Sequence, residues 1–142
     1  MIKYQIVIDT NVIVSALQSS RGASFKLLML LGKPSFDINI SIPLILEYED
    51  VTKRLIGQIP LTGTDIDRVL DYICKVANQH NIFFLWRPFL KDPKDDMVLE
   101  LAVTAQCDFI VTYNQKDFKH INQFGIEAIT PKEFLQKIGE LP

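Results

Sequence analysis

The fold of this chain can be inferred from the stretch Ile6-Val7-Ile8-Asp9-Thr10-Asn11. Its apolar half is short and β-branched, which is typical of a strand buried on both faces. The run ends at an acid, and a carboxylate at the C-terminal end of a central parallel strand stands where open α/β sheets bind ligands. Asp9 can instead cap the segment Val12 to Leu17, although Asn11 can do this as well. Asp9 therefore marks a site only if other acids reach the same edge of the sheet.

The composition is that of a globular protein. The 142 residues, 48% apolar and 23% charged, fit a single domain (residues 1–142) with a sizeable core. The longest apolar run, Phe25 to Leu31, is too short to span a bilayer, and Met1 to Tyr4 lacks signal-peptide features. Cys74 and Cys107 have no metal-ligand spacing, which favours buried thiols in a reducing compartment. We therefore expect a cytoplasmic protein without a membrane segment.

Strand and helix patterns alternate along the chain. Beyond the first strand, strands are predicted at Asp37–Ile42, Ile82–Trp86, Cys107–Thr112 and Gly125–Ile129, and helices at 12–17, 23–31, 43–56, 64–77, 92–105 and 130–138. This order predicts a three-layer α/β/α sandwich with a central parallel sheet. Right-handed crossovers bring the C-terminal ends of all its strands to one edge. The helix at 23–31 is apolar nearly all round, which favours a surface covered by a partner.

Two helices contribute informative acids. Glu47 lies on the flank of the apolar stripe of its helix, where a carboxylate either pairs with a cation such as Arg54 or takes part in chemistry, and this position alone favours the ion pair. In the helix at 92–105, Asp92 is a good cap before Pro93, and Asp95 is placed to reach back to the cap. Asp96 remains. Its negative charge either interacts favourably with the positive end of the helix dipole, or its side chain faces inward and needs a cation nearby.

A further polar group follows the strand Cys107–Thr112, which ends at Thr112 and continues into Asn114 and Asp117. The predicted edge thus carries oxygen ligands, while His80 and His120 have no partners at ligand spacing. Oxygen ligands without thiolate or imidazole select Mg²⁺ or Mn²⁺, and carboxylate-held Mg²⁺ usually serves phosphate chemistry. Walker A and glycine-rich dinucleotide motifs are absent from the sequence. The net charge of −2 does not indicate a nucleic-acid binder, but acids that hold cations lower the formal charge without excluding one.

The chain resembles the PIN domain family, in the branch of VapC-like toxins of toxin–antitoxin systems. The matching stretches are Ile-Val-Ile-Asp9-Thr-Asn11-Val, Glu47 on the helix after the second strand, Asp92-Pro-Lys-Asp-Asp96 with Leu-Glu-Leu-Ala, Phe-Ile-Val-Thr112-Tyr-Asn114-Gln-Lys-Asp117-Phe, and Thr130-Pro-Lys-Glu-Phe-Leu135. Together they cover essentially the whole chain in the right order. The resemblance implies a metal-dependent endoribonuclease with Asp9, Glu47 and Asp96 as acidic ligands. The fourth family position is often Asp and falls here on Asn114, so either a second metal is weakened or Asp117 assists.

The resulting hypothesis is a ribonuclease that uses Mg²⁺ or Mn²⁺ to activate water against an RNA phosphodiester. The catalytic metal ligands are Asp9, Glu47 and Asp96, completed by Asn114 or Asp117; the supporting residues are Thr10, Asn11 and Thr112; the candidates for RNA contact are Arg21, Arg54 and Arg87. For each arginine, a surface salt bridge is the simpler role. The resemblance also implies an antitoxin that covers this edge and a homodimer formed through apolar helix faces.

Two other functions fit the pattern less well. A phosphatase of the haloacid dehalogenase type would use Asp9 as a nucleophile, but it requires a second Asp where Asn11 stands and a lysine on a late helix near the site. A catalytically degenerate PIN domain would bind RNA or a protein without cutting.

Overall fold

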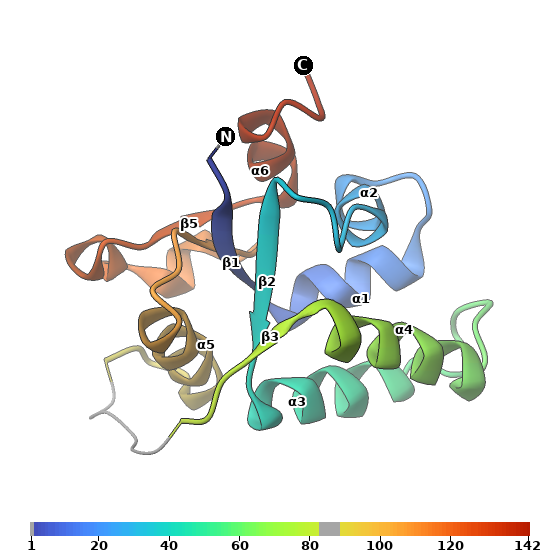
Figure 1. Cartoon of the computed structure of the whole chain (residues 1–142). Coiled ribbons are helices and arrows are strands. Elements are labelled where there is room, and N and C mark those ends of the chain that lie inside the picture. The colour runs from blue at the N-terminus through green and yellow to red at the C-terminus, as the bar shows by residue number, and fades with distance from the viewer. Residues whose placement is uncertain (1, 83–88) are drawn as a thin grey trace.

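A computed structural model describes residues 2–82 and 89–142 (Figure 1). The strands are β1 (Tyr4–Ile8), β2 (Phe36–Ile40), β3 (Asn78–Gln79), β4 (Phe109–Val111) and β5 (Glu127–Ile129). The helices are α1 (Thr10–Gln18), α2 (Ala23–Met29), α3 (Ile42–Lys53), α4 (Gly63–Val76), α5 (Pro93–Thr104) and α6 (Pro131–Lys137), with the 3-10 turns η1 (Gln115–Phe118) and η2 (Ile121–Phe124). Within these residues the strands form one parallel sheet of order β3-β2-β1-β4-β5.

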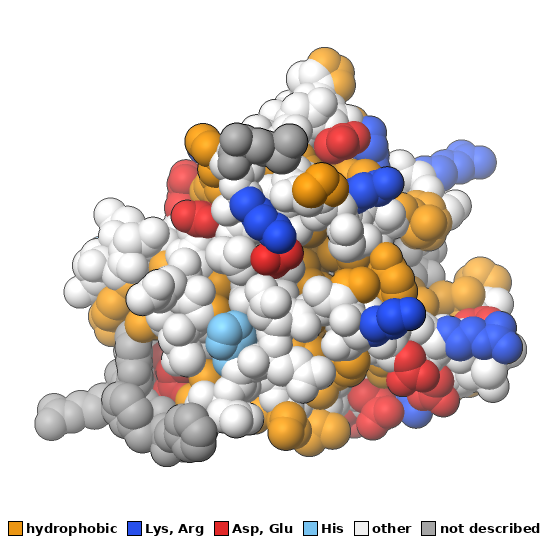
Figure 2. Space-filling model, viewed as in Figure 1, with side chains coloured by type: hydrophobic (Ala, Val, Ile, Leu, Met, Phe, Trp, Pro, Cys, Tyr) orange, Lys and Arg blue, Asp and Glu red, His pale blue; other side chains and the backbone are white. Residues whose placement is uncertain are grey.

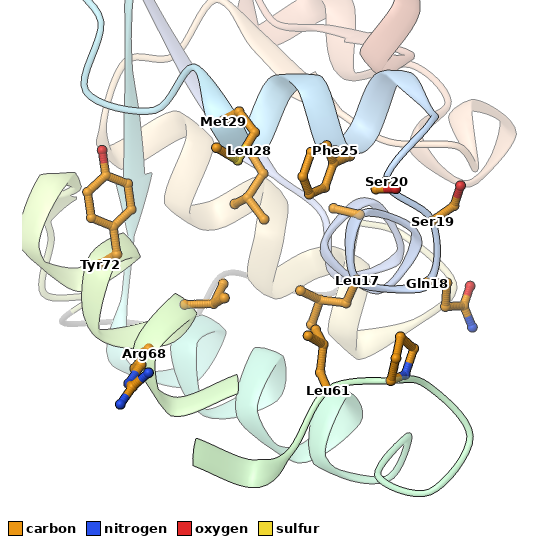
Figure 3. A pocket seen from close by; sticks show the side chains of 13 residues that line it. Leu17, Gln18, Ser19, Ser20, Phe25, Leu28, Met29, Leu61, Arg68 and Tyr72 are labelled. Carbon is orange, nitrogen blue, oxygen red and sulfur yellow. The ribbon is translucent and has the colours of Figure 1, made fainter. Parts of the chain in front are cut away.

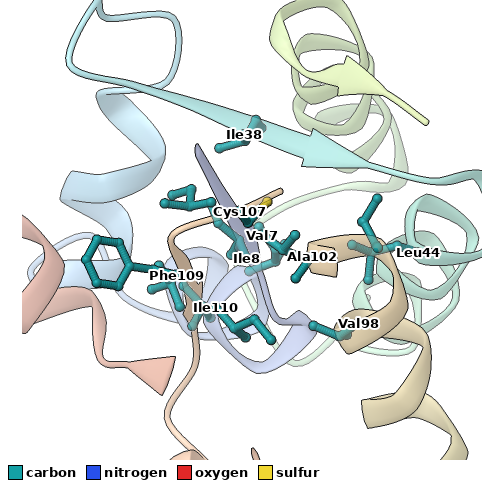
Figure 4. Close-up of a cluster of buried hydrophobic side chains, with 14 of the residues drawn as sticks. Val7, Ile8, Ile38, Leu44, Val98, Ala102, Cys107, Phe109 and Ile110 are labelled. Atoms are coloured by element: carbon teal, nitrogen blue, oxygen red, sulfur yellow. The ribbon is translucent and has the colours of Figure 1, made fainter. Parts of the chain in front are cut away.

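Strand β1 lies at the centre of the sheet, between β2 and β4. Ile6 pairs with Ile38 on one side and with Phe109 on the other. Ile6, Val7 and Ile8 are at most 3% exposed, because helices cover both faces of the strand. Figure 4 shows Val7 and Ile8 among the core side chains. The predicted central strand, buried on both faces, is confirmed.

The sheet lies between two layers of helices. Helices α1 to α4 lie on one side of the sheet and α5 lies on the other (Figure 1), and α6 packs against α2. From β1 to β2 to β3 the chain moves toward one edge of the sheet, and through α5 it crosses back to β4 on the other side of β1. Because crossovers between parallel strands are right-handed, this reversal places α5 on the opposite face of the sheet. The predicted α/β/α sandwich is therefore confirmed. Within residues 2–82 and 89–142, no helix is long and apolar enough to cross a membrane.

The third strand differs from the prediction. The strand paired with β2 is Asn78–Gln79, whose residues align with Asn39 and Ile40. His80 extends this edge: its N–H donates to the Ile40 carbonyl at 2.9 Å and its Nε2 lies 2.8 Å from Asn39 Oδ1. Ile82 is not in a strand, and the remainder of the predicted strand Ile82–Trp86 lies outside the described residues.

Helix α4 begins at Gly63, one residue before the predicted start at residue 64. Thr62 is the cap: its Oγ1 accepts the Asp65 N–H at 3.2 Å, and Asp65 Oδ2 accepts the Thr62 N–H at 2.9 Å. Thr64 has an acid at the same spacing, Asp67, but that carboxylate pairs with Lys53 at 2.8 Å. The two overlapping capping-box patterns are thus resolved by a tertiary contact.

Candidate active site

Asp9 stands at the C-terminal end of β1 and is 7% exposed. Its N–H donates to the Val111 carbonyl at 2.9 Å, which continues the sheet beyond the strand. Its Oδ1 accepts the Thr10 N–H at 2.9 Å, and its Oδ2 accepts the Thr112 hydroxyl at 2.8 Å. Asp9 therefore caps α1 and also faces the end of β4. Burial raises the pKa of Asp9, the two hydrogen bonds oppose this, and the charges of Glu47 and Asp117 raise it further.

The predicted supporting residues hold the acids in place. The Thr10 hydroxyl donates to Glu47 Oε2 at 2.5 Å. The Asn11 amide donates to Asp9 Oδ2 and to Thr112 Oγ1, both at 3.3 Å, and its Oδ1 accepts the Tyr113 N–H at 3.2 Å. These contacts cross from β1 to the end of β4, so they fix both strand ends relative to each other.

Glu47 reaches this edge because α3 is anchored to β1. The buried Tyr48 hydroxyl donates to the Ile8 carbonyl, immediately before Asp9. Burial and the charges of Asp9 and Glu47 raise the pKa of Tyr48. The Glu47 side chain is 13% exposed, and its Oε1 lies 3.6 Å from Lys94 Nζ.

The cation expected as the simpler partner of Glu47, Arg54, does not contact it. Arg54 pairs instead with Asp50 at 2.6 Å, one helical turn earlier on the exposed face. Lys94 was not singled out from the sequence, because it lies on another helix and the helical pattern of α3 carries no signal for it.

The first turn of α5 exchanges the roles expected for two neighbouring acids. Asp96 Oδ1 accepts the N–H groups of Phe89 and Leu90 at 3.1 and 2.8 Å, so this carboxylate binds the segment before the helix. Burial raises the pKa of Asp95 to about 7, and the negative charges of Asp9, Asp92, Asp117 and Glu47 add to this. The structure thus brings Asp95, rather than Asp96, into electrostatic contact with the other acids.

The cap of α5 does not engage the Asp95 carboxylate. Asp92 caps α5 as predicted, with its Oδ1 accepting the Lys94 N–H at 2.9 Å. Asp95 was predicted to reach back to the same cap, but within the described residues no hydrogen bond joins the Asp95 carboxylate to Asp92. Asp95 is consequently left to face the acids on β1 and α3.

The segment after β4 contributes the last acid. The Asn114 N–H donates to Thr112 Oγ1 at 3.0 Å, and the Asp117 N–H donates to the Asn114 carbonyl at 2.9 Å. Among the hydrogen bonds of the described residues, none uses the Asn114 side chain. Asp117 is exposed, and its charge raises the pKa of both Asp9 and Asp95. The short η1 turn therefore presents Asp117 to the acid cluster, which we define as Asp9, Glu47, Asp95 and Asp117.

The predicted RNA-contacting arginines do not gather here. Arg54 is paired with Asp50, and Arg21 is exposed in the turn before α2, with its N–H bonded to the Ser19 hydroxyl. Arg87 lies outside the described residues.

The acid cluster suits a hard divalent cation by its chemistry. Its donors are all oxygens. Burial raises the pKa of Asp9 and Asp95, their mutual repulsion adds to this, and a cation would remove the repulsion. The arrangement is not a preformed cage: among the described residues no three Asp, Glu, His or Cys side chains are grouped as a metal site. Glu47 would have to exchange its contact with Lys94 for the ion.

Comparisons with known proteins give one family and one fold. A family model described as PIN domain matches residues 5–116. An uncharacterized protein from Methanocaldococcus jannaschii is 27% identical over an alignment of 149 positions that covers 96% of this chain and 92% of that protein. The crystal structure of VapBC2 from Rickettsia felis bound to a DNA fragment from their promoter aligns with 87% of this chain and 98% of its own matched chain. Its TM-score is 0.57 at 17% identity, a likeness of fold.

Proposed function

The chain belongs to the PIN domain family, and from this premise we propose that it is a metal-dependent endoribonuclease that hydrolyses RNA phosphodiester bonds. The observation that carries the proposal is the acid cluster, in which carboxylates from β1, α3, α5 and η1 act on one another strongly enough to help raise the pKa of Asp95 to about 7. Acids that repel one another at the C-terminal edge of a parallel sheet indicate a cation-binding centre.

In this proposal Asp9, Glu47 and Asp95 hold Mg²⁺ or Mn²⁺, and Asp117 or Asn114 adds a further oxygen. Asp95 takes the place that the sequence argument gave to Asp96, because the Asp96 carboxylate is engaged by the Phe89 and Leu90 N–H groups. The exposed Asp117 compensates for the neutral Asn114.

The bound ion would neutralise charge on the phosphoryl oxygens and lower the pKa of water. The chain's own residues orient the acids. Thr112 and Asn11 fix the Asp9 carboxylate, and Thr10 fixes Glu47. Without the ion, Asp95 retains a proton up to about neutral pH, and Lys94 balances the charge of Glu47.

We also propose that this chain is the toxin of a toxin–antitoxin pair in the cytoplasm, with a small antitoxin covering the acid cluster and a homodimer formed through apolar helix faces. An apolar cavity of about 570 Å³ between α1, α2 and α4 supports an apolar partner surface (Figure 3). Phe25, Leu28 and Met29 of α2 line it, together with Leu61 and Tyr72, and Met29 is 63% exposed. This agrees with the partner surface expected for α2 from its sequence.

The test is cleavage of an end-labelled single-stranded RNA in Mn²⁺, in EDTA, and by the variant Asp9→Asn. We expect cleavage by the wild-type protein in Mn²⁺ only. The matched control is Asp71→Asn, which removes an exposed carboxylate on α4 and should leave cleavage within about twofold of wild type. Cleavage that persists in EDTA contradicts the proposal.

Two further measurements separate the rival functions. A phosphatase of the haloacid dehalogenase type would transfer the phosphoryl group of a monoester to Asp9 with loss of the alcohol, and water would then hydrolyse the acyl-phosphate to phosphate. The contacts argue against it, since both Asp9 oxygens accept hydrogen bonds and Asn11 is bonded to Asp9. A degenerate PIN domain would bind RNA with unchanged affinity in Asp9→Asn and would not cut it in Mn²⁺.

A further inference from the structure

A second cavity, of about 610 Å³, opens directly beside the acid cluster. It lies between the segment that precedes α5 and the η1 turn, and Asp95 and Asp117 form part of its wall. The rest of its wall includes Lys91, Lys116 and Lys119. Asp92 also lines the cavity, and Lys91 and Lys116 directly precede Asp92 and Asp117 in the sequence, so a group that occupies this cavity meets both the acids and the lysines.

These three lysines carry charges that nearby carboxylates do not pair with. Across residues 2–82 and 89–142, none of them forms a salt bridge, whereas Lys94 and Lys53 both pair with carboxylates. On the molecular face in Figure 2, Lys and Arg side chains are interspersed with Asp and Glu, as the ion pairs of α3 illustrate. Lysines that share a cavity without such partners are suited to bind phosphate groups, because no carboxylate has to be displaced.

The cavity also contains an aromatic surface. Phe89 lines it and is 39% exposed. Its ring packs edge-on against Phe124, with 5.2 Å between the ring centroids, and its backbone N–H is held by Asp96. A partly exposed ring that is fixed from one side offers its remaining surface to a flat ligand such as a nucleobase.

We propose that this cavity binds the nucleotides next to the scissile phosphodiester of a single-stranded RNA. Lys91, Lys116 and Lys119 contact its phosphates, and Phe89 stacks on an unpaired base. The strand must be single because a base that is paired and stacked in a duplex does not offer its face to Phe89. This inference rests on the proposed function, and it assigns RNA contact to these lysines in place of Arg21 and Arg54.

The experiment measures binding without cleavage. A short fluorescein-labelled oligouridylate is titrated with the full chain in EDTA, and its anisotropy is followed at several salt concentrations. We expect the triple variant K91Q/K116Q/K119Q to bind at least about tenfold more weakly. The slope of log K against log salt should fall by about 0.7 for each phosphate that the variant no longer neutralises. The matched control K33Q/K75Q/K132Q removes the same charge from surfaces outside the cavity, and should change affinity less than about threefold.

Phe89 is tested separately. Phe89→Ala should weaken binding about 5- to 150-fold with an unchanged salt slope, since stacking releases no counterions. Phe89→Tyr keeps the ring and should bind like wild type, which separates stacking from any disturbance of the segment before α5.

Equal losses of affinity in the two triple variants, or a duplex competitor that binds as tightly as the single strand, would overturn the inference. Its failure is distinct from that of the proposed function. If RNA binds through these residues but is never cleaved, the ribonuclease proposal fails and the cavity assignment stands. If the protein cleaves RNA but the lysine variants bind it normally, the cavity assignment fails and the ribonuclease proposal stands.

Discussion

Asp95 and Asp96 are adjacent in the sequence, yet their carboxylates leave α5 about 100° apart. Asp95 faces the other members of the acid cluster, and Asp96 accepts hydrogen bonds from two N–H groups of the preceding segment. We therefore expect Asp95→Asn to reduce Mn²⁺-dependent RNA cleavage by about 100-fold or more, as loss of a metal ligand does. Asp96→Asn should reduce it less than about threefold, because an amide oxygen still accepts both hydrogen bonds. Initial cleavage rates of the two variants are compared on the same labelled RNA. A larger loss for Asp96→Asn than for Asp95→Asn would make Asp96 the metal ligand.

Asp96 has a structural effect that can be measured without activity. Asp96→Ala leaves the Phe89 and Leu90 N–H groups without their acceptor, and we expect a loss of about 1 kcal/mol in the free energy of unfolding. Urea denaturation of Asp96→Ala and Asp96→Asn gives this difference directly. Equal stability of the two variants would show that these hydrogen bonds do not hold the segment.

The raised pKa of Asp95 makes stability depend on pH. Burial and the surrounding acids raise this pKa from 3.8 to about 7, so between these values the folded protein holds a proton that the unfolded chain has released. The contribution of Asp95 to the free energy of unfolding therefore falls as pH rises through this window. In EDTA, we expect the melting temperature to decline less steeply with pH for Asp95→Asn than for wild type. Because cations bind the deprotonated carboxylate, Mn²⁺ should raise the wild-type melting temperature more at about pH 8 than at about pH 5.5.

At the scale of secondary-structure elements, the position of Glu47 depends on how α3 is docked. The Tyr48 hydroxyl ties the helix to the Ile8 carbonyl at the end of β1. Tyr48→Phe leaves that buried carbonyl without this donor, and we expect a loss of about 1–2 kcal/mol in the free energy of unfolding, measured in urea. Cleavage should fall as well, by less than for Asp9→Asn, since Glu47 remains present but is held less firmly. Unchanged stability would show that packing alone positions α3.

Elements whose signals are local could be predicted from the sequence. The end of β1 at Asp9, the capping box of Thr130 and Glu133, and the cap Asp92 with Pro93 each depend on residues within one turn of one another. At these three positions the structure keeps the local pattern, because residues within the same turn satisfy the backbone groups.

The remainder depended on contacts between distant segments. The exchange of Asp95 and Asp96 was missed because two N–H groups in the segment before α5 attract Asp96, and no periodicity encodes that choice. The short strand β3 carries polar residues, Asn78 and Gln79, whose place in the sheet comes from pairing with β2. An edge position tolerates residues of low strand propensity, because one side of the strand needs no partner.

In the part of the chain that the structure describes, two cavities of the molecule differ in their chemistry. One adjoins the acid cluster and carries lysines, and the other, between α1, α2 and α4, is apolar and open. An exposed apolar surface of this kind is typical of protein–protein contact sites, which is the role proposed for it. Among the described residues the two cavities share no lining side chain, so a partner on the apolar surface would not cover the residues proposed to bind RNA.

Self-association through the apolar cavity can be tested by adding one charge. Met29→Asp places a carboxylate on this surface at a side chain that is 63% exposed, so the fold should tolerate it. We expect light scattering after size-exclusion chromatography to give a dimer for wild type and a monomer for Met29→Asp, because burying the new charge opposes association. The matched control is Ile42→Asp, which alters an equally exposed apolar residue, 64%, on α3 outside the cavity. If Ile42→Asp rather than Met29→Asp yields the monomer, the dimer forms through α3, and the cavity between α1, α2 and α4 is not the dimer interface.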